Sequence, residues 1–122
     1  TIVNRIRREN EALQNNTSLV FHNTTDDNIV CYSKASADGT NIILTAVNVD
    51  PHNTHAAWLE LDLAAMNLDE GKPFQVHELL SNARFTWHGA RNYVQLNPAV
   101  IPAHIFRIRR RVRTERDFEY FL

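Results

Sequence analysis

Short runs of alternating apolar and polar residues, separated by turn residues, are the feature that most constrains the fold of this chain. In residues 57–63, three leucines alternate with Trp58, Glu60 and Asp62. Such alternation places successive side chains on opposite faces of a strand. Comparable runs recur at roughly 8–12 residue intervals, the pattern of an all-β sandwich. The expected strands are residues 19–21, 29–34, 41–50, 57–63, 74–80, 84–87, 93–96 and 103–109.

The strongest of these runs, residues 41–50, is almost continuously apolar, which is typical of a central strand covered on both faces. Asp50-Pro51 ends it because proline cannot donate to the hydrogen-bond ladder. Asp38-Gly39 predicts a tight turn before it. We therefore expect an all-β fold, an antiparallel β-sandwich of about eight strands of the Greek-key type, preceded by one short helix.

The first 14 residues show helical rather than strand spacing. Ile2, Val3, Ile6 and Leu13 fall near one face of a helix. The polar residues 15–18 compete for backbone hydrogen bonds and end it. The chain starts at Thr1 rather than Met, so we expect a piece of a longer protein. The expected organisation is a helix over residues 1–17 that closes a preceding domain, and a sandwich domain over residues 18–122.

Composition excludes several classes of protein. A 43% apolar content argues against disorder, and no apolar run approaches the ~18 residues of a membrane span. A formal net charge of −1 favours neither nucleic acid nor membrane as a partner. Arginines crowd positions 107–116 but are joined by acidic residues, so we expect a solvated or intrachain-paired strand end, with a nucleic-acid site as the alternative. The single Cys31 excludes an internal disulfide and suits a reducing, cytoplasmic location.

No catalytic constellation is recognisable. Asp26-Asp27 and Asp69-Glu70 fall in turns, where carboxylates cap backbone N–H groups. His52 and His55 follow Asp50-Pro51 in a loop, and we expect both to be solvated. Cys31 lies among apolar residues of a strand, which favours a buried thiol over a nucleophile. We expect no catalytic residue, no metal site and no cofactor in this chain.

Two tryptophans are the candidate carbohydrate-binding residues, because sugars stack on flat rings. Trp58 shares its strand face with acidic residues and should point outward, either toward a glycan or into an interface between domains. Trp87 precedes His88-Gly89, and core packing is the favoured interpretation of that ring.

Five segments, in order along the chain, resemble one enzyme family. NRIRRENEALQ at 4–14 resembles the N-x-I-R-R-x-N-P-A-L stretch near the last helix of α-amylase-type barrels, with Glu11 in place of proline. VNVDPH at 47–52 resembles a strand end of bacterial C-terminal domains, and FQVHELL at 74–80 resembles F-x-V-x-D-L-L, with Glu78 for aspartate. The segments 87–98 and 102–106 complete the series. The chain is similar to the C-terminal part of α-1,4-glucan:maltose-1-phosphate maltosyltransferases, with trehalose synthases second.

The resemblance implies a non-catalytic C-terminal domain that packs against and stabilises a catalytic barrel. The parent enzyme would be a retaining transferase of the α-amylase superfamily that moves maltosyl units from maltose 1-phosphate to α-1,4-glucans, and it is a candidate homodimer. An Asp nucleophile and a Glu general acid/base would act in its barrel, upstream of Thr1. An autonomous α-glucan-binding module is the alternative, and the outward Trp58 supports it.

Overall fold

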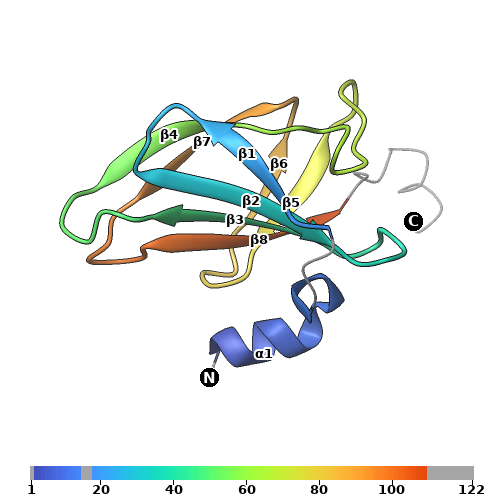
Figure 1. Cartoon of the computed structure of the whole chain (residues 1–122), viewed down its shortest axis with the longest axis horizontal. Helices are drawn as coiled ribbons and strands as arrows, with labels where there is room; N and C mark the ends of the chain where they lie inside the picture. The colour runs from blue at the N-terminus through green and yellow to red at the C-terminus, as the bar shows by residue number, and fades with distance from the viewer. Residues whose placement is uncertain (1, 15–17, 110–122) are drawn as a thin grey trace, which may run out of the picture.

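The computed structural model describes residues 2–14 and 18–109, in which eight strands follow a short helical segment (Figure 1). The elements are α1 (Ile2–Glu9), the 3₁₀ turn η1 (Glu11–Gln14), β1 (Val20–Thr24), β2 (Ile29–Ala35), β3 (Ile42–Asn48), β4 (His55–Glu60), β5 (Phe74–Glu78), β6 (Arg84–Trp87), β7 (Arg91–Leu96) and β8 (Ala103–Arg109). The all-β class and the single leading helix are as predicted.

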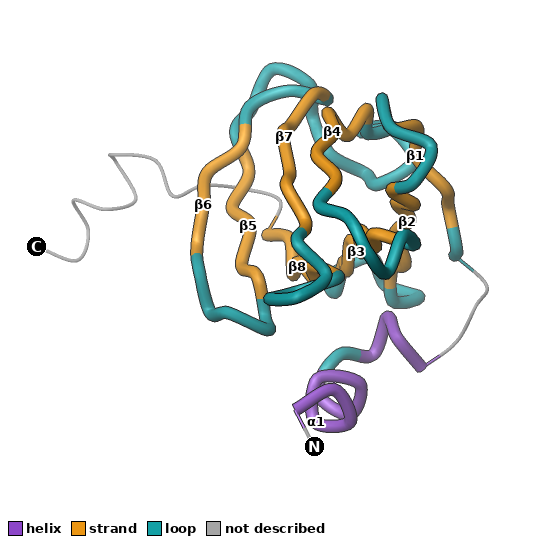
Figure 2. The backbone as a smooth tube through the Cα atoms, turned by 90° about the vertical axis from the view of Figure 1, so that its left-hand side faces the viewer, coloured by secondary structure: helices purple, strands orange, loops and turns teal. Residues whose placement is uncertain are grey.

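The strands pair antiparallel in the order β6-β5-β8-β3-β2-β1-β4-β7. Strands β1, β2 and β3 are consecutive neighbours, and β4 returns to lie beside β1, which is the 4-1-2-3 order of a Greek key. Figure 2 shows the sheet curling until β7 and β4 face β8 and β3 across the core. The Greek-key sandwich is therefore confirmed.

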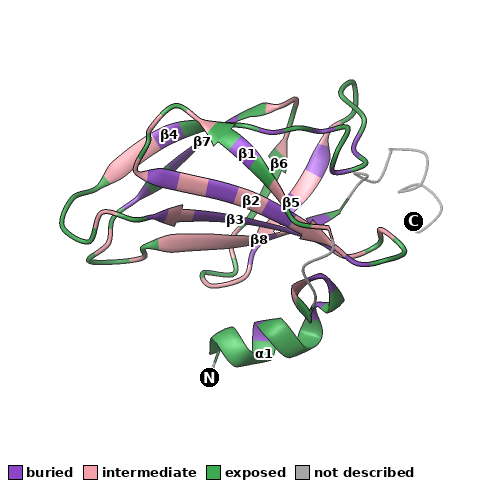
Figure 3. Cartoon of the chain, viewed as in Figure 1, coloured by how far each residue is buried: buried purple, intermediate pink, exposed green. Residues whose placement is uncertain are grey.

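Strand β1 joins the two layers of the sandwich. Its first half pairs with β2, through Phe21 and Tyr32 among others, and its second half pairs with β4, where Asn23 faces Glu60. Figure 3 colours the buried residues of the strands purple. Between the layers lies one apolar core. Its largest fully buried apolar side chains are Phe74, Phe106, Ile42, Leu44, Leu59, Leu96 and Ile108. Removing a side chain of this size from water contributes about 1.5–3 kcal/mol.

The predicted helix over residues 1–14 is interrupted at Asn10. The buried Asn10 side chain donates from Nδ2 to the Ile6 carbonyl at 2.9 Å, and the chain then tightens into η1. Asn41, ahead of β3, fixes this turn: it donates to Asn10 Oδ1 and accepts from the Ala12 N–H, both at 2.9 Å. The helical segment is thus tied to the sandwich at its C-terminal end, while Ile2 and Val3 at its start stay exposed.

The strand expected over residues 57–63 begins and ends earlier, as β4. The leucine alternation continues past its end because Leu61 and Leu63 still fill the core from the connection that follows. The Leu61 N–H donates to Ala90, and the Asp62 carboxylate caps the turn by accepting from the Ala65 N–H. The predicted Asp38-Gly39 turn is confirmed, with Gly39 at φ 74°. The expectation for the basic and acidic tail after residue 109 lies outside the described residues.

Candidate functional site

Trp58 stands on the outer face of β4 as predicted, with 42% of its surface exposed. Its cross-strand neighbour on β7, Tyr93, is 52% exposed, and the two rings meet edge to face at 5.5 Å. The Arg91 guanidinium carbon lies 4.9 Å from the centre of the Trp58 ring, and Arg91 Nε is 3.5 Å from Glu60 Oε2. We call Trp58, Tyr93, Arg91 and Glu60 the aromatic platform.

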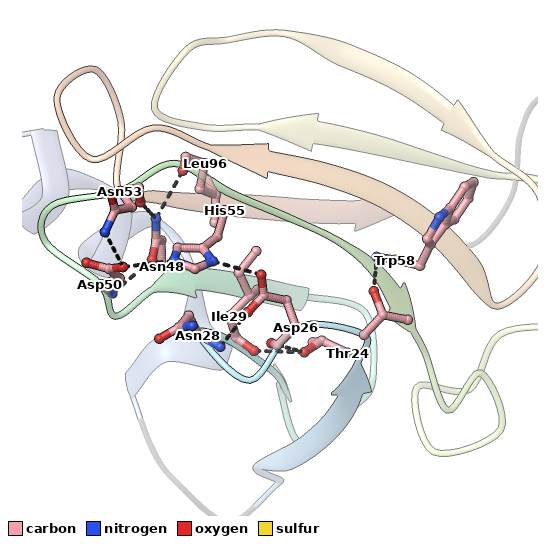
Figure 4. A network of polar contacts seen from close by, with 11 residues as sticks. Thr24, Asp26, Asn28, Ile29, Asn48, Asp50, Asn53, His55, Trp58 and Leu96 are labelled. Atoms are coloured by element: carbon pink, nitrogen blue, oxygen red, sulfur yellow. Dashed lines mark hydrogen bonds and ion pairs between the residues drawn. The ribbon is translucent and has the colours of Figure 1, made fainter.

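The backbone of the aromatic platform is held by the loop after β1. Thr25 donates its N–H to the Trp58 carbonyl and accepts the Trp58 N–H on Oγ1 at 2.9 Å (Figure 4). A flat exposed indole can stack against a sugar ring or a partner protein. Because Arg91 already covers one face of the indole and Tyr93 is tilted by 65°, a ligand would find one stacking surface and not a continuous aromatic groove.

Trp87 lies elsewhere, at the end of β6, and is half-buried. Its ring packs edge-on against Phe106 at 5.0 Å and Phe74 at 6.2 Å. It is therefore part of the wall of the core, the packing that sequence alone favoured. The structure does not place Trp58 and Trp87 on one binding surface: Trp58 is exposed on the outer face of β4, whereas Trp87 packs against Phe74 and Phe106 of the core.

His55 departs from the prediction of a solvated loop histidine. It begins β4, and both ring nitrogens reach carboxylates at 2.8 Å, Nδ1 to Asp26 and Nε2 to Asp50 (Figure 4). Carboxylates only accept, so both contacts are hydrogen bonds when the ring is an imidazolium with a proton on each nitrogen. Asp50 first and Asp26 second raise the pKa of His55, while the Asn28 N–H and then His55 lower the pKa of Asp26. The cluster ties the β1–β2 loop to the β3–β4 loop.

The polar loops around His55 satisfy their own groups. The buried Asn48 side chain donates to the carbonyls of Leu96 at 3.0 Å and Asn53 at 2.9 Å (Figure 4). Asp50 accepts from the His52 N–H. These bonds have a structural role, because Asp26 and Asp50 each accept from a backbone N–H and from the His55 ring. The Asp50-Pro51 strand end is the one sequence signal for the His55 cluster. The other carboxylate, Asp26, is 29 residues from His55, so no local spacing in the sequence connects the two.

Glu78, at the end of β5, is a buried carboxylate that also serves the backbone. It accepts from the N–H groups of Ile105 (2.8 Å), Ser81 (2.7 Å) and Leu80 (3.2 Å), and His104 stands 3.8 Å away. Burial alone would raise the pKa of Glu78, but His104 and these donors outweigh it and lower the pKa to about 2. Because the Glu78 carboxylate, at the end of β5, accepts from the backbone of β8 and of the β5–β6 turn, it links β5 to β8.

The remaining buried titratable groups also have structural roles. Burial raises the pKa of the Cys31 thiol to about 12, so it stays protonated and apolar in character, as expected from sequence. Burial lowers the pKa of His22, against a smaller opposing effect of Asp62. His22 accepts the Asp62 N–H on Nδ1, and its Nε2 contacts the Ser33 hydroxyl at 2.8 Å. Within residues 2–14 and 18–109, no three His, Cys, Asp or Glu side chains are grouped to hold a metal ion.

An apolar surface runs from α1 across the outer face of β1 and β2. Phe21 is 67% exposed and packs against Tyr32 at 6.0 Å, and with Leu19, Val30 and Lys34 these residues line a shallow hollow. Tyr32 and Lys34 also line the neighbouring hollow formed with Val3, Ile6 and Leu13, so the two are continuous. We call Val3, Leu19, Phe21, Val30 and Tyr32 the outer apolar surface.

No helix among the described residues is long and apolar enough to cross a membrane.

Comparison with known proteins gives a consistent answer. Residues 21–108 match the family described as "GLGE, C-terminal". Among curated proteins, α-1,4-glucan:maltose-1-phosphate maltosyltransferases are 48% identical over 87% of the chain in Rhodospirillum rubrum, 42% over 88% in Chlorobaculum tepidum, and 40% over 90% in Streptomyces coelicolor (the protein numbered 2). The matched part is 15% to 17% of the length of these relatives.

Proposed function

The chain belongs to the family of GLGE C-terminal domains, and we propose that it is a non-catalytic domain that packs against and stabilises the catalytic barrel of a cytoplasmic maltosyltransferase. The parent enzyme would carry maltosyl units from maltose 1-phosphate to α-1,4-glucans, the activity in the names of its relatives. Because the chain spans only 15% to 17% of those relatives, the reacting groups would lie in the rest of the protein. In this proposal, residues 1–17 are the terminal helix of the barrel and residues 18–122 are the accessory sandwich.

The observation that supports this proposal is the outer apolar surface. Val3 is 53% exposed, Leu19 40% and Phe21 67%, on elements that adjoin the start of the chain. Contiguous apolar patches of this kind mark interaction sites in folded domains. A short helix is also marginal alone, and α1 is held to the sandwich mainly by Ile6, Asn10 and Ala12. A barrel packed over this surface would bury Val3 and Phe21, gaining about 1.5–3 kcal/mol for each large side chain.

The test uses the full-length parent enzyme with Phe21→Asp and, separately, Val3→Asp. We expect a lower melting temperature and loss of maltosyl transfer on heating at temperatures that the wild type survives. The matched control is Val100→Asp, because Val100 is 79% exposed and lies in the β7–β8 connection, outside the outer apolar surface. Equal melting temperatures for all three variants and the wild type would contradict the proposal.

A second candidate function is binding of α-1,4-glucan at the aromatic platform, with Trp87 as the other candidate ring. The exposure of Trp58 favours it, but a single stacking surface partly covered by Arg91 would give weak affinity, with a dissociation constant at or above roughly 1 mM. Calorimetric titration of the 122-residue chain with maltoheptaose measures it. Micromolar binding that disappears in Trp58→Ala, but not in Phe85→Ala, would instead establish an autonomous glucan-binding module.

A further inference from the structure

The outer face of β5, β6 and β8 carries a cluster of positive charge that the accessory role does not use. Strand register builds it: His77 on β5 pairs with Arg84 on β6 and with Arg107 on β8. Gln75, two residues earlier, likewise pairs with Thr86 and Arg109. Directly paired residues share a face of the sheet, so the six side chains stand in two adjacent rows. With Val76 and Phe85 they line a cavity of about 220 Å³; we call it the arginine cavity.

No carboxylate lines the arginine cavity, and within residues 2–14 and 18–109 none forms an ion pair with Arg84, Arg107 or Arg109. Burial first, and then the like charges of Arg109 and Arg84, lower the pKa of Arg107; only the field of Glu9 on α1 opposes them. Like charges held close together repel one another, and a bound anion would offset this repulsion.

The Arg107 side chain, at the centre of the cluster, is held in place by His77. Asn82, with φ 65°, accepts from His77 Nε2–H at 2.6 Å, so His77 Nδ1 is an acceptor and takes a hydrogen bond from Arg107 Nη2 at 3.3 Å. Arg107 Nε is buried and has no hydrogen-bond partner among the residues that the structure describes. His77 therefore positions Arg107. Gln75 and Thr86 add neutral donors at the same wall of the cavity.

We propose that the arginine cavity binds the phosphoryl group of inorganic phosphate or of a small phosphate ester. Guanidinium donors come from two strands on either side of β5, and a tetrahedral phosphate can accept from donors in several directions. A carboxylate is planar and is well served by one arginine fork. The volume of the cavity suits one phosphoryl group with a few waters, and not a length of nucleic-acid strand.

The test is titration of the isotopically labelled 122-residue chain with inorganic phosphate at constant ionic strength, followed by amide chemical shifts. We expect saturable shifts at residues 75–77, 84–86 and 107–109, and a dissociation constant of about 1 mM. Arg84→Gln and Arg107→Gln should each weaken binding about tenfold or more. Arg84 is exposed on an edge strand, so its substitution tests the site without disturbing the core. Arg5→Gln, which removes the same charge from an exposed position on α1 outside the cavity, should have no effect.

Two further probes identify the ligand. Maltose 1-phosphate binding as tightly as inorganic phosphate would show that the phosphoryl group alone is recognised, and tighter binding would show that the sugar contributes; either supports the proposal. Absence of saturable binding by both phosphates would overturn it, as would equal weakening by Arg5→Gln and Arg84→Gln. Saturable binding of a glutamate-rich peptide without binding of phosphate would also overturn it, and would assign the cavity to an acidic polypeptide.

Discussion

Replacing Glu78 by glutamine should cost the chain a substantial part of its stability. Glutamine keeps the shape, but only one of its two terminal atoms can accept hydrogen bonds. With its oxygen toward Ile105 and Leu80, its amide group faces the Ser81 N–H, which loses an acceptor at a 2.7 Å position. Leaving a buried donor unpaired costs about 1–3 kcal/mol, with more lost because the acceptor was charged. We expect the free energy of unfolding to fall by roughly 2–4 kcal/mol near pH 7.

The pH dependence gives an independent measure of the same interaction. Lowering the pKa of Glu78 from its usual 4.5 to about 2 corresponds to roughly 3 kcal/mol of stability. Because the folded pKa is depressed, this stability is present above pH 4.5 and is lost as the pH falls toward about 2.

Urea denaturation of wild type and Glu78→Gln across this range should show the two curves converging toward acid, with exposed Glu70→Gln tracking the wild type. A loss under about 1 kcal/mol near pH 7, or a constant difference at all pH values, would refute the reasoning.

Three further outcomes follow from other parts of the structure. His55→Gln should lower the melting temperature most below about pH 6.5; because the pKa of His55 is raised, the wild-type advantage should shrink as the pH rises through that folded pKa, whereas His52→Gln should do little. The 122-residue chain should form no product from maltodextrin or maltose 1-phosphate, since Asp26, Asp50 and Glu78 already accept hydrogen bonds from the backbone of turns and strands; product from chain purified to homogeneity would contradict this. In hydrogen exchange, amides of α1 should exchange faster than those of β3, and equal protection in a monomer would show that α1 is integral to this domain.

The sequence predicted the strands well because most of them bury one face. Arg84–Trp87 and Ala103–Arg109 match β6 and β8 end to end, and alternation located β4. The predicted strand ends differ from the observed ones where apolar residues outside a strand pack into the core, as Leu61 and Leu63 do after β4. The predicted helix is longer than α1 because asparagine is tolerated within a helix. The capping role of Asn10 depends on Asn41, which is far along the chain.

Candidate sites were harder to predict, since they depend on register. The outward position of Trp58 follows from parity alone, and the core packing of Trp87 follows from the general tendency of large aromatic rings to be buried. The pairing of His55 with Asp26 and the convergence of Arg84 with Arg107 cross from one strand or loop to another. The periodicity of a single sequence does not indicate which strands are neighbours in the sheet. These contacts can therefore be identified only once the sheet order is known.

The two strands at the ends of the sheet order, β6 and β7, are consecutive in the chain and joined by residues 88–90 alone. Both edges of the sheet therefore open along the same side of the molecule (Figure 2). Each edge also carries an exposed arginine, Arg84 on β6 and Arg91 on β7. A strand from another copy would have to enter between these edges and meet positive charge on either one, which discourages edge-to-edge aggregation. Association with other chains or domains is thereby directed to side-chain surfaces and away from backbone pairing.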